Sequence, residues 1–216
     1  MKRLLLLPML LLAGMPARAA AILFIPQPDA AYVSATTLLP ITGPPESATT
    51  AISEGALTIS FLSGGSPLWM LVHSVPASWG TWGAPPDTES STPIVVAPFD
   101  GPDVTSLLYQ FSQPLSTFGM ELEPDDQAVH QIAVQFLYGG NVQATLSLAV
   151  NGDSGARLFA ATGGVFDSVL VSSDTDFAAA QFRYAVNSRE PGSLWLFAAG
   201  VVCLASKFCL KRRIHD

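Results

Sequence analysis

Two glutamates spaced two residues apart, Glu121 and Glu123, are side chains of this sequence that could carry out acid–base chemistry. On an extended strand they lie on one face with their Cα atoms about 6.6 Å apart, which permits the carboxyl separations found in glycoside hydrolases. Met120 and Leu122 alternate with them, so this strand is predicted to have one apolar face and one face of solvated carboxylates. A solvated strand face is the simpler interpretation. An extracellular hydrolase is a further hypothesis, ranked below the two functions given at the end of this subsection.

A second candidate for chemistry is Gly152-Asp153-Ser154-Gly155, which copies the core of the nucleophile motif of trypsin-like serine proteases. Ala156 stands where that motif has Gly, and neither His73 nor His130 lies in the sequence context of the protease histidine. A serine nucleophile needs a base within about 3 Å and a third group that orients the base. The sequence offers no such set, so we expect a polar β-turn here, no catalytic residue, and a protein that is not an enzyme.

Acidic residues near predicted turns could supply oxygen ligands for calcium. Six to eight such ligands would be needed, and the sequence contains no EF-hand loop or Gly-Gly-x-Gly-x-Asp repeat. We therefore expect no cofactor, with calcium binding as an alternative to a simply acidic surface. The histidines do not form a metal-binding set. The calcium candidates are Asp100, Asp103, Asp125 and Asp126.

Three tryptophans lie in a stretch rich in Gly, Pro, Ser and Thr, residues 64–102, which we expect to form a long surface excursion. Aromatic rings are good apolar partners for pyranose rings, so Trp79 and Trp82 are candidate glycan contacts. The interpretation that we favour is that the aromatic side chains hold the long loop against the rest of the domain.

The elements that would position these residues are predicted to be strands. Apolar and polar residues alternate with a period of two, and Gly139-Gly140-Asn141 predicts a hairpin turn between residues 132–136 and 142–150. No helix is expected before the C-terminal apolar run. The pattern predicts an all-β fold, an antiparallel β-sandwich of jelly-roll type. Further strands are expected at residues 57–61, 107–111, 118–122, 156–160, 168–172 and 180–184.

The charge of the chain is divided unevenly. Between Ala20 and Glu190 there are 3 basic residues, all arginine, against 16 acidic ones, which gives this part a net charge of −13. Such a surface repels phosphate backbones, so nucleic acid is not expected as a partner.

The N-terminus has the three parts of a secretory signal peptide. Lys2-Arg3 precede the apolar run from Leu4 to Leu12, and Ala17-Arg18-Ala19 supplies an A-x-A cleavage site. We expect signal peptidase to cleave after Ala19 and the protein to be exported.

The C-terminus combines a short polar motif, an apolar run and a basic stop. The 17 residues from Leu194 to Leu210 would span roughly 26 Å as a helix, slightly less than a hydrocarbon core of about 30 Å. The bases Lys211, Arg212 and Arg213 would stay cytoplasmic by the positive-inside rule. A single transmembrane helix is therefore expected, preceded by the residues Arg189, Glu190, Pro191, Gly192 and Ser193.

This tail resembles the PEP-CTERM sorting signal of Gram-negative bacteria that make exopolysaccharide, although the first Pro of Pro-Glu-Pro is Arg189 here and Lys207 interrupts the apolar run. The resemblance implies recognition by an exosortase, an intramembrane protease that cuts near the motif and passes the protein to the surface or matrix. Residues 79–184 also resemble exported domains of PEP-CTERM proteins. The matching segments are 79–83 with Glu89, 118–124, 155–161 and 180–184.

The predicted organisation is therefore a signal peptide (1–19), an exported β-sandwich domain (20–186), a linker with the PEP-like motif (187–193), a transmembrane sorting anchor with its basic stop (194–213), and a cytoplasmic tail (214–216). We expect a non-enzymatic protein, anchored transiently in the inner membrane and then located at the cell surface or in an exopolysaccharide matrix. The alternative is a carbohydrate- or calcium-binding extracellular module. Signal peptidase, exosortase, the membrane and exopolysaccharide are the expected partners.

Overall fold

The computed structural model describes residues 21–99 and 104–187. The predicted signal peptide, sorting motif, transmembrane anchor and basic stop lie outside these residues, as do Asp100 and Asp103. Among the described residues, no helix is long and apolar enough to cross a membrane.

The described chain is an antiparallel all-β structure, which confirms this part of the predicted fold, and thirteen strands form one continuous hydrogen-bonded sheet. Its single helix in the described ranges is α1 (Ala30–Ala35), which was not predicted. The strands are β1 (Leu23–Ile25), β2 (Thr37–Leu39), β3 (Ala48–Thr49), β4 (Ala51–Glu54), β5 (Leu57–Ser63), β6 (Ser66–Pro67), β7 (Met70–Ser74), β8 (Ile94–Pro98), β9 (Ser106–Pro124), β10 (Val129–Tyr138), β11 (Asn141–Asn151), β12 (Arg157–Ser172) and β13 (Phe177–Val186).

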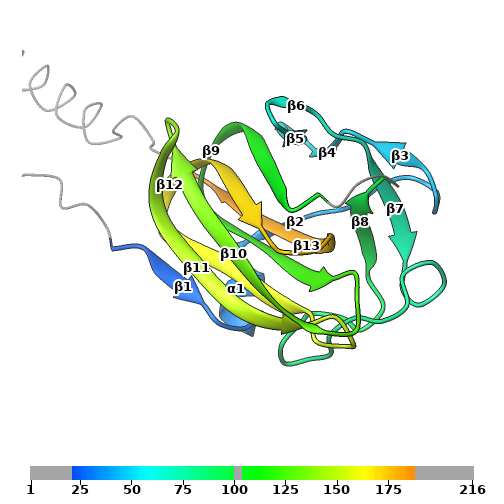
Figure 1. Cartoon of the computed structure of the whole chain (residues 1–216). Coiled ribbons are helices and arrows are strands. Elements are labelled where there is room, and N and C mark those ends of the chain that lie inside the picture. The colour runs from blue at the N-terminus through cyan, green and yellow to red at the C-terminus, as the bar shows by residue number, and fades with distance from the viewer. Residues whose placement is uncertain (1–20, 100–103, 188–216) are drawn as a thin grey trace, which may run out of the picture.

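Two long strands, β9 and β12, run through the centre of the molecule (Figure 1). Their register shifts between Thr162 and Ser168, and each half of the pair has different neighbours. The first half of β9 pairs with β5, and the second half pairs with β13. Similarly, β10 pairs with the second half of β12 and β1 with the first half. The single sheet therefore curls into a sandwich-like form around one core.

The core draws side chains from both halves of this sheet. β9 contributes Tyr109 to one half and Phe118 to the other, and the Tyr109 and Phe118 rings both contact Phe182 of β13. Alternate residues of β10, including Val134 and Phe136, point into the same cluster. The two-residue period that predicted these strands therefore reflects a real core face.

Two local predictions are confirmed and two are corrected. The hairpin forms between β10 and β11 with Gly139 and Gly140 at positive φ, and residues 152–154 form the turn expected at the Gly152-Asp153-Ser154-Gly155 motif. The segments expected as separate strands at 107–111 and 118–122 are one strand, as are those at 156–160 and 168–172. The stretch 64–102 contains β6, β7 and β8, and only its middle, residues 75–93, is a long loop.

Candidate functional site

The two glutamates that could act as acid and base are buried, which corrects the prediction of solvated carboxylates. Glu121 and Glu123 are both 0% exposed. At the C-terminal end of β9, Met120 and Leu122 point into the main core. The opposite face of the strand, which carries the two glutamates, is covered by the loop of residues 75–93. The covering loop brings Trp79 and Trp82 onto the sheet, where they form a second apolar cluster.

Small residues make this second cluster possible. β13 presents Ala178 and Ala180 to the loop while Phe177 and Ala179 face the main core. A methyl group leaves room for an indole ring to lie close to the sheet. The loop therefore covers β9 and β13 with tryptophans. This agrees with the interpretation that the aromatic side chains hold the loop against the rest of the domain.

Glu121 accepts two hydrogen bonds from this loop. Trp82 Nε1 donates to Oε2 at 2.9 Å, and the backbone N–H of Glu89 donates to Oε1 at 2.5 Å. Burial raises the pKa of Glu121 to about 7, and these two donors act in the opposite direction by stabilising the carboxylate. Both oxygens of Glu121 are thus engaged within the protein.

Glu123 is held in the same way one step further along β9. Trp79 Nε1 donates to its Oε2 at 3.3 Å, while the Thr81 hydroxyl and the Gly155 N–H donate to Oε1, each at 3.3 Å. Burial raises its pKa to about 7 as well, again against the effect of the donors. Glu123 therefore ties the loop to the turn that follows β11.

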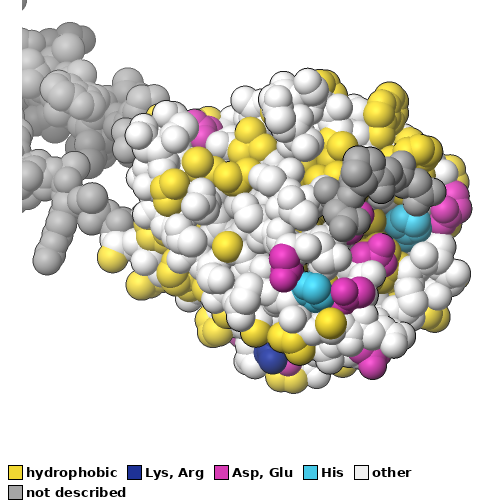
Figure 2. Space-filling model, viewed as in Figure 1, with side chains coloured by type: hydrophobic (Ala, Val, Ile, Leu, Met, Phe, Trp, Pro, Cys, Tyr) yellow, Lys and Arg dark blue, Asp and Glu magenta, His cyan; other side chains and the backbone are white. Residues whose placement is uncertain are grey.

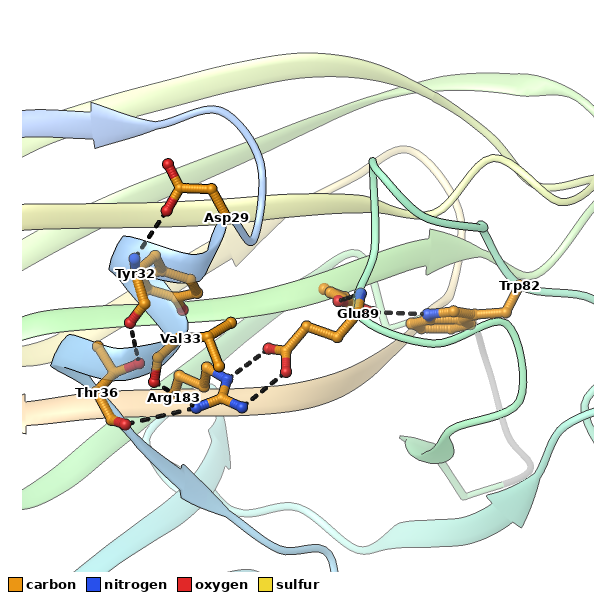
Figure 3. Close-up of polar contacts among 8 residues, drawn as sticks. Asp29, Tyr32, Val33, Thr36, Trp82, Glu89 and Arg183 are labelled. Atoms are coloured by element: carbon orange, nitrogen blue, oxygen red, sulfur yellow. Dashed lines mark hydrogen bonds and ion pairs between the residues drawn. The ribbon is translucent and has the colours of Figure 1, made fainter.

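Arg183 of β13 joins the loop to the helix (Figure 3). Its Nε and Nη2 donate to the two carboxylate oxygens of Glu89 at 2.6 and 2.8 Å, a bidentate pair in which both side chains are nearly buried. Its Nη1 donates to the carbonyl oxygens of Val33 and Thr36, at 3.3 and 3.5 Å, at the C-terminal end of α1. The carboxylate of Glu89 beside it is the main reason why the pKa of Arg183 is raised.

The local backbone explains how these side chains come together. Gln181 has φ of 50° and marks a bulge at which the register between β13 and β9 shifts, just before Arg183. Asp29 caps α1 by accepting the N–H of Tyr32 at 2.8 Å. Gly119 lets Tyr32 approach β9, because a Cβ there would lie 2.3 Å from the Tyr32 hydroxyl oxygen.

The four segments that carry the resemblance to exported PEP-CTERM domains meet in this one network. The loop supplies Trp79, Trp82 and Glu89, β9 supplies Glu121 and Glu123, and the other two segments supply the partners described above. The sequence interpretation missed Glu89 and Arg183 as a pair. Their signal was the presence of an arginine inside an apolar strand in a domain, residues 20–186, with only two basic residues.

The arrangement is suited to holding the fold together. Neither Glu121 nor Glu123 lines the surface grooves of about 380 to 450 Å³ that lie beside β1, beside the loop at Pro85-Pro86, and beside Tyr138. The polar atoms of both carboxylates are occupied by N–H and O–H donors from the chain itself. We therefore interpret the network as a structural clamp on the loop of residues 75–93.

The protease-like motif lies at an exposed turn. Ser154 has φ of 60°, and its N–H donates to the Thr81 hydroxyl at 3.2 Å. His73 lies beside Glu46 at 3.2 Å, and His130 lies between two aspartates. The structure therefore brings neither histidine to Ser154.

The two calcium candidates within the described residues, Asp125 and Asp126, make hydrogen bonds to different partners in the chain. Asp126 accepts the N–H of Ala128 at 2.8 Å and contacts His130 Nε2 at 2.7 Å, while Asp174 contacts His130 Nδ1 at 2.6 Å. The Asp125 N–H donates to the Asp176 carbonyl. In residues 21–99 and 104–187, no group of three or more His, Cys, Asp or Glu could hold a metal ion. These contacts do not test calcium binding, which stays the alternative to a simply acidic surface.

The predicted glycan contacts are mostly enclosed. Trp79 is 9% exposed and Trp82 is 3% exposed, and both indole N–H groups donate to glutamates. Neither ring offers an open face in this structure, so the burial counts against sugar stacking at these two positions.

Comparisons with known proteins give no family. No family model matches the chain, and the search of curated proteins found no significant match. Among solved structures, the CBM51-2 and INT domains of Clostridium perfringens ZmpB, in complex with GlcNAc, are 11% identical with a TM-score of 0.34, over 66% of this chain and 30% of that one. The enzymatically active domain of bacteriophage CBA120 tailspike protein 4 is 14% identical with a TM-score of 0.28, over 60% and 19%. The chain thus spans less than a third of either solved chain, and similarities this low carry no argument about function.

Proposed function

We propose that this chain is an exported, non-enzymatic protein of the cell surface or exopolysaccharide matrix, sorted and cleaved by an exosortase at its PEP-CTERM-like tail. In this proposal the signal peptide directs export, the transmembrane helix holds the protein transiently in the inner membrane, and a jelly-roll-like β-sandwich is the part delivered. The observation that carries it is the order of Glu190-Pro191-Gly192-Ser193, an apolar run and a basic stop at the end of a chain that begins like a secretory precursor.

The geometry of the β domain supports a non-enzymatic role. Glu121 and Glu123 are the pair of acids that the sequence singles out for hydrolysis, and both are buried as acceptors for the covering loop. A carboxylate used in this way cannot also reach a substrate without opening the loop.

The test is the intact mass of the protein recovered from its own cells, fraction by fraction, with its C-terminus mapped. A species that starts at Ala20 and ends near Glu190 is expected in the surface or matrix fraction. Replacing both Glu190 and Pro191 by Ala should leave the tail attached, whereas the nearby change Asn187→Ala should not. A wild-type protein that keeps residues 194–216 in every fraction would overturn the proposed processing.

A further inference from the structure

A groove beside β1 has the features of a binding site for a sugar. It has a volume of about 450 Å³, within the range of small-ligand sites. It lies where the sheet divides, because β10 pairs with the second half of β12 and β1 with the first half, with β11 next to β10 (Figure 1). Its lining includes Phe24 and Gln27 near β1, Leu148 of β11, and the pair Asp87 and Arg157.

The apolar part of this groove combines an open ring with a buried floor. Phe24 is 44% exposed, although its ring centroid lies 6.5 Å from that of Phe136, which helps to fix its position. Leu158 is buried beneath the groove, and Leu148 is half-buried at its side. A ring that is held in place and open on one side can take the apolar C–H face of a pyranose.

The polar part is a preformed ion pair. Arg157 Nη1 lies 2.5 Å from Asp87 Oδ1, and the two side chains are 46% and 35% exposed. A guanidinium is only a donor and a carboxylate only an acceptor, so together they match adjacent hydroxyl groups, each of which both donates and accepts. An ion pair this exposed contributes at most about 1 kcal/mol to stability, so sharing it with a ligand costs the fold little.

Charge selects the kind of sugar. The pair is neutral as a unit, and the acid at the rim together with the acidic domain disfavours uronates and other anionic glycans. On the face of the molecule that is drawn in Figure 2, acidic side chains outnumber basic ones. We propose that the groove lined by Phe24, Gln27, Asp87 and Arg157 binds a neutral pyranose unit of a polysaccharide. The identity of the ligand as a matrix polysaccharide rests on the proposed function. In this proposal the groove, and not Trp79 and Trp82, is the sugar contact.

The experiment is calorimetric titration of the purified full chain in a detergent without a sugar headgroup. The probes are the neutral oligomers cellohexaose, maltohexaose and a galactomannan hexamer, with an oligogalacturonate as the acidic comparison. Saturable binding of at least one neutral probe is expected. Phe24→Ala, Arg157→Gln and Asp87→Asn should each weaken it tenfold or more. The matched control is Leu23→Ala, the neighbouring residue of β1, which is 62% exposed, is not among the groove residues, and should change affinity less than twofold.

Three results would overturn the assignment. They are failure of every neutral probe to bind the wild-type protein, tighter binding of the oligogalacturonate, and unchanged affinity in the Arg157 and Asp87 variants. Sensitivity to Phe24→Ala alone would indicate an apolar partner and likewise reject a sugar. The charge variants keep the test valid if Phe24→Ala misfolds. Since the C-terminal mass is measured separately, loss of sugar binding in a correctly processed protein rejects the groove and leaves the sorting proposal standing.

Discussion

At the scale of single residues, the side chains that looked reactive are those that the fold uses as internal acceptors. Glu121 and Glu123 could be recognised from the sequence as a pair on one face of a strand, but not as buried. The pattern of β9 alone implies one wet face, and the loop that covers this face comes from about 40 residues earlier in the chain. No periodicity within a strand reports what a distant loop places upon it.

The buried pair of Arg183 and Glu89 is expected to contribute more to stability than its exposed neighbour, the pair of Arg157 and Asp87. Glu89→Gln leaves a nearly buried guanidinium without its charge partner, which should cost about 3 kcal/mol of unfolding free energy. Asp87→Asn, the matched control on the same loop, should cost less than about 1 kcal/mol. Urea unfolding of the two variants checks this, and equal losses would contradict a clamping role for Arg183.

Stability should also depend on the titration of the two buried glutamates. Their pKa values are raised by burial to about 7 from 4.5, so the folded protein keeps protons that the unfolded chain has released between these pH values. The free energy of unfolding must therefore fall as pH rises from 4.5 to 7, by up to about 3 kcal/mol for each group, and level off above this range.

The thermal midpoint measured at pH 5 and at pH 8 checks this expectation. Glu121→Gln cannot ionise and should flatten the decrease. His130, whose hydrogen bond to Asp174 is the main reason why its pKa is raised, also adds stability at low pH that is lost at higher pH. His130→Gln is therefore the control that separates the two contributions. A midpoint that rises from pH 5 to pH 8 would show that the glutamates do not titrate in this way.

At the scale of the elements, the sequence predicts what is encoded locally. The hairpin between β10 and β11 follows from adjacent glycines at positive φ, and the segments 107–111 and 118–122 of β9 follow from their alternation, although their union into one strand does not. The helix α1 was missed because six residues show too little of a helical period, and its clearest signal is the single capping residue Asp29. The strands β7 and β8 were missed because Gly, Pro and Ser dominate the stretch that surrounds them.

The contact between α1 and β9 gives a prediction at this scale. Gly119→Ala would place a Cβ 2.3 Å from the Tyr32 hydroxyl and 2.6 Å from the Ala160 Cβ, so one of these elements must shift. We expect a loss of about 1 to 3 kcal/mol of unfolding free energy. Gly80→Ala is the matched control, because a Cβ there meets nothing within 4 Å. Adding Tyr32→Phe should recover part of the loss, and full tolerance of Gly119→Ala would mean that the helix lies farther from the sheet.

At the scale of the whole molecule, residues 20–190 combine 16 acidic residues with 3 basic ones, and two of the acids, Glu121 and Glu123, are buried. The remaining acids repel one another over distances that salt shortens, since the Debye length falls from about 30 Å at 0.01 M to about 8 Å at 0.15 M ionic strength. Added NaCl is therefore expected to raise the thermal midpoint by a few degrees. The clamp made by Arg183 is less exposed to salt and should not offset this gain.

The same measurement separates an acidic surface from a calcium site. If the acids act only through their summed charge, CaCl₂ and MgCl₂ at equal ionic strength should raise the midpoint equally. A specific site binds the folded state alone and adds a stabilisation that grows with calcium concentration. Magnesium is the matched control because it has the same charge but needs near-octahedral ligands at shorter distances.

We expect the two salts to raise the midpoint equally, because the described acids that lie together around His130 are already engaged with its imidazole ring. A midpoint that rises further with calcium, and returns when the ion is chelated, would contradict this and assign the acids near Asp125 and Asp126 a ligand role.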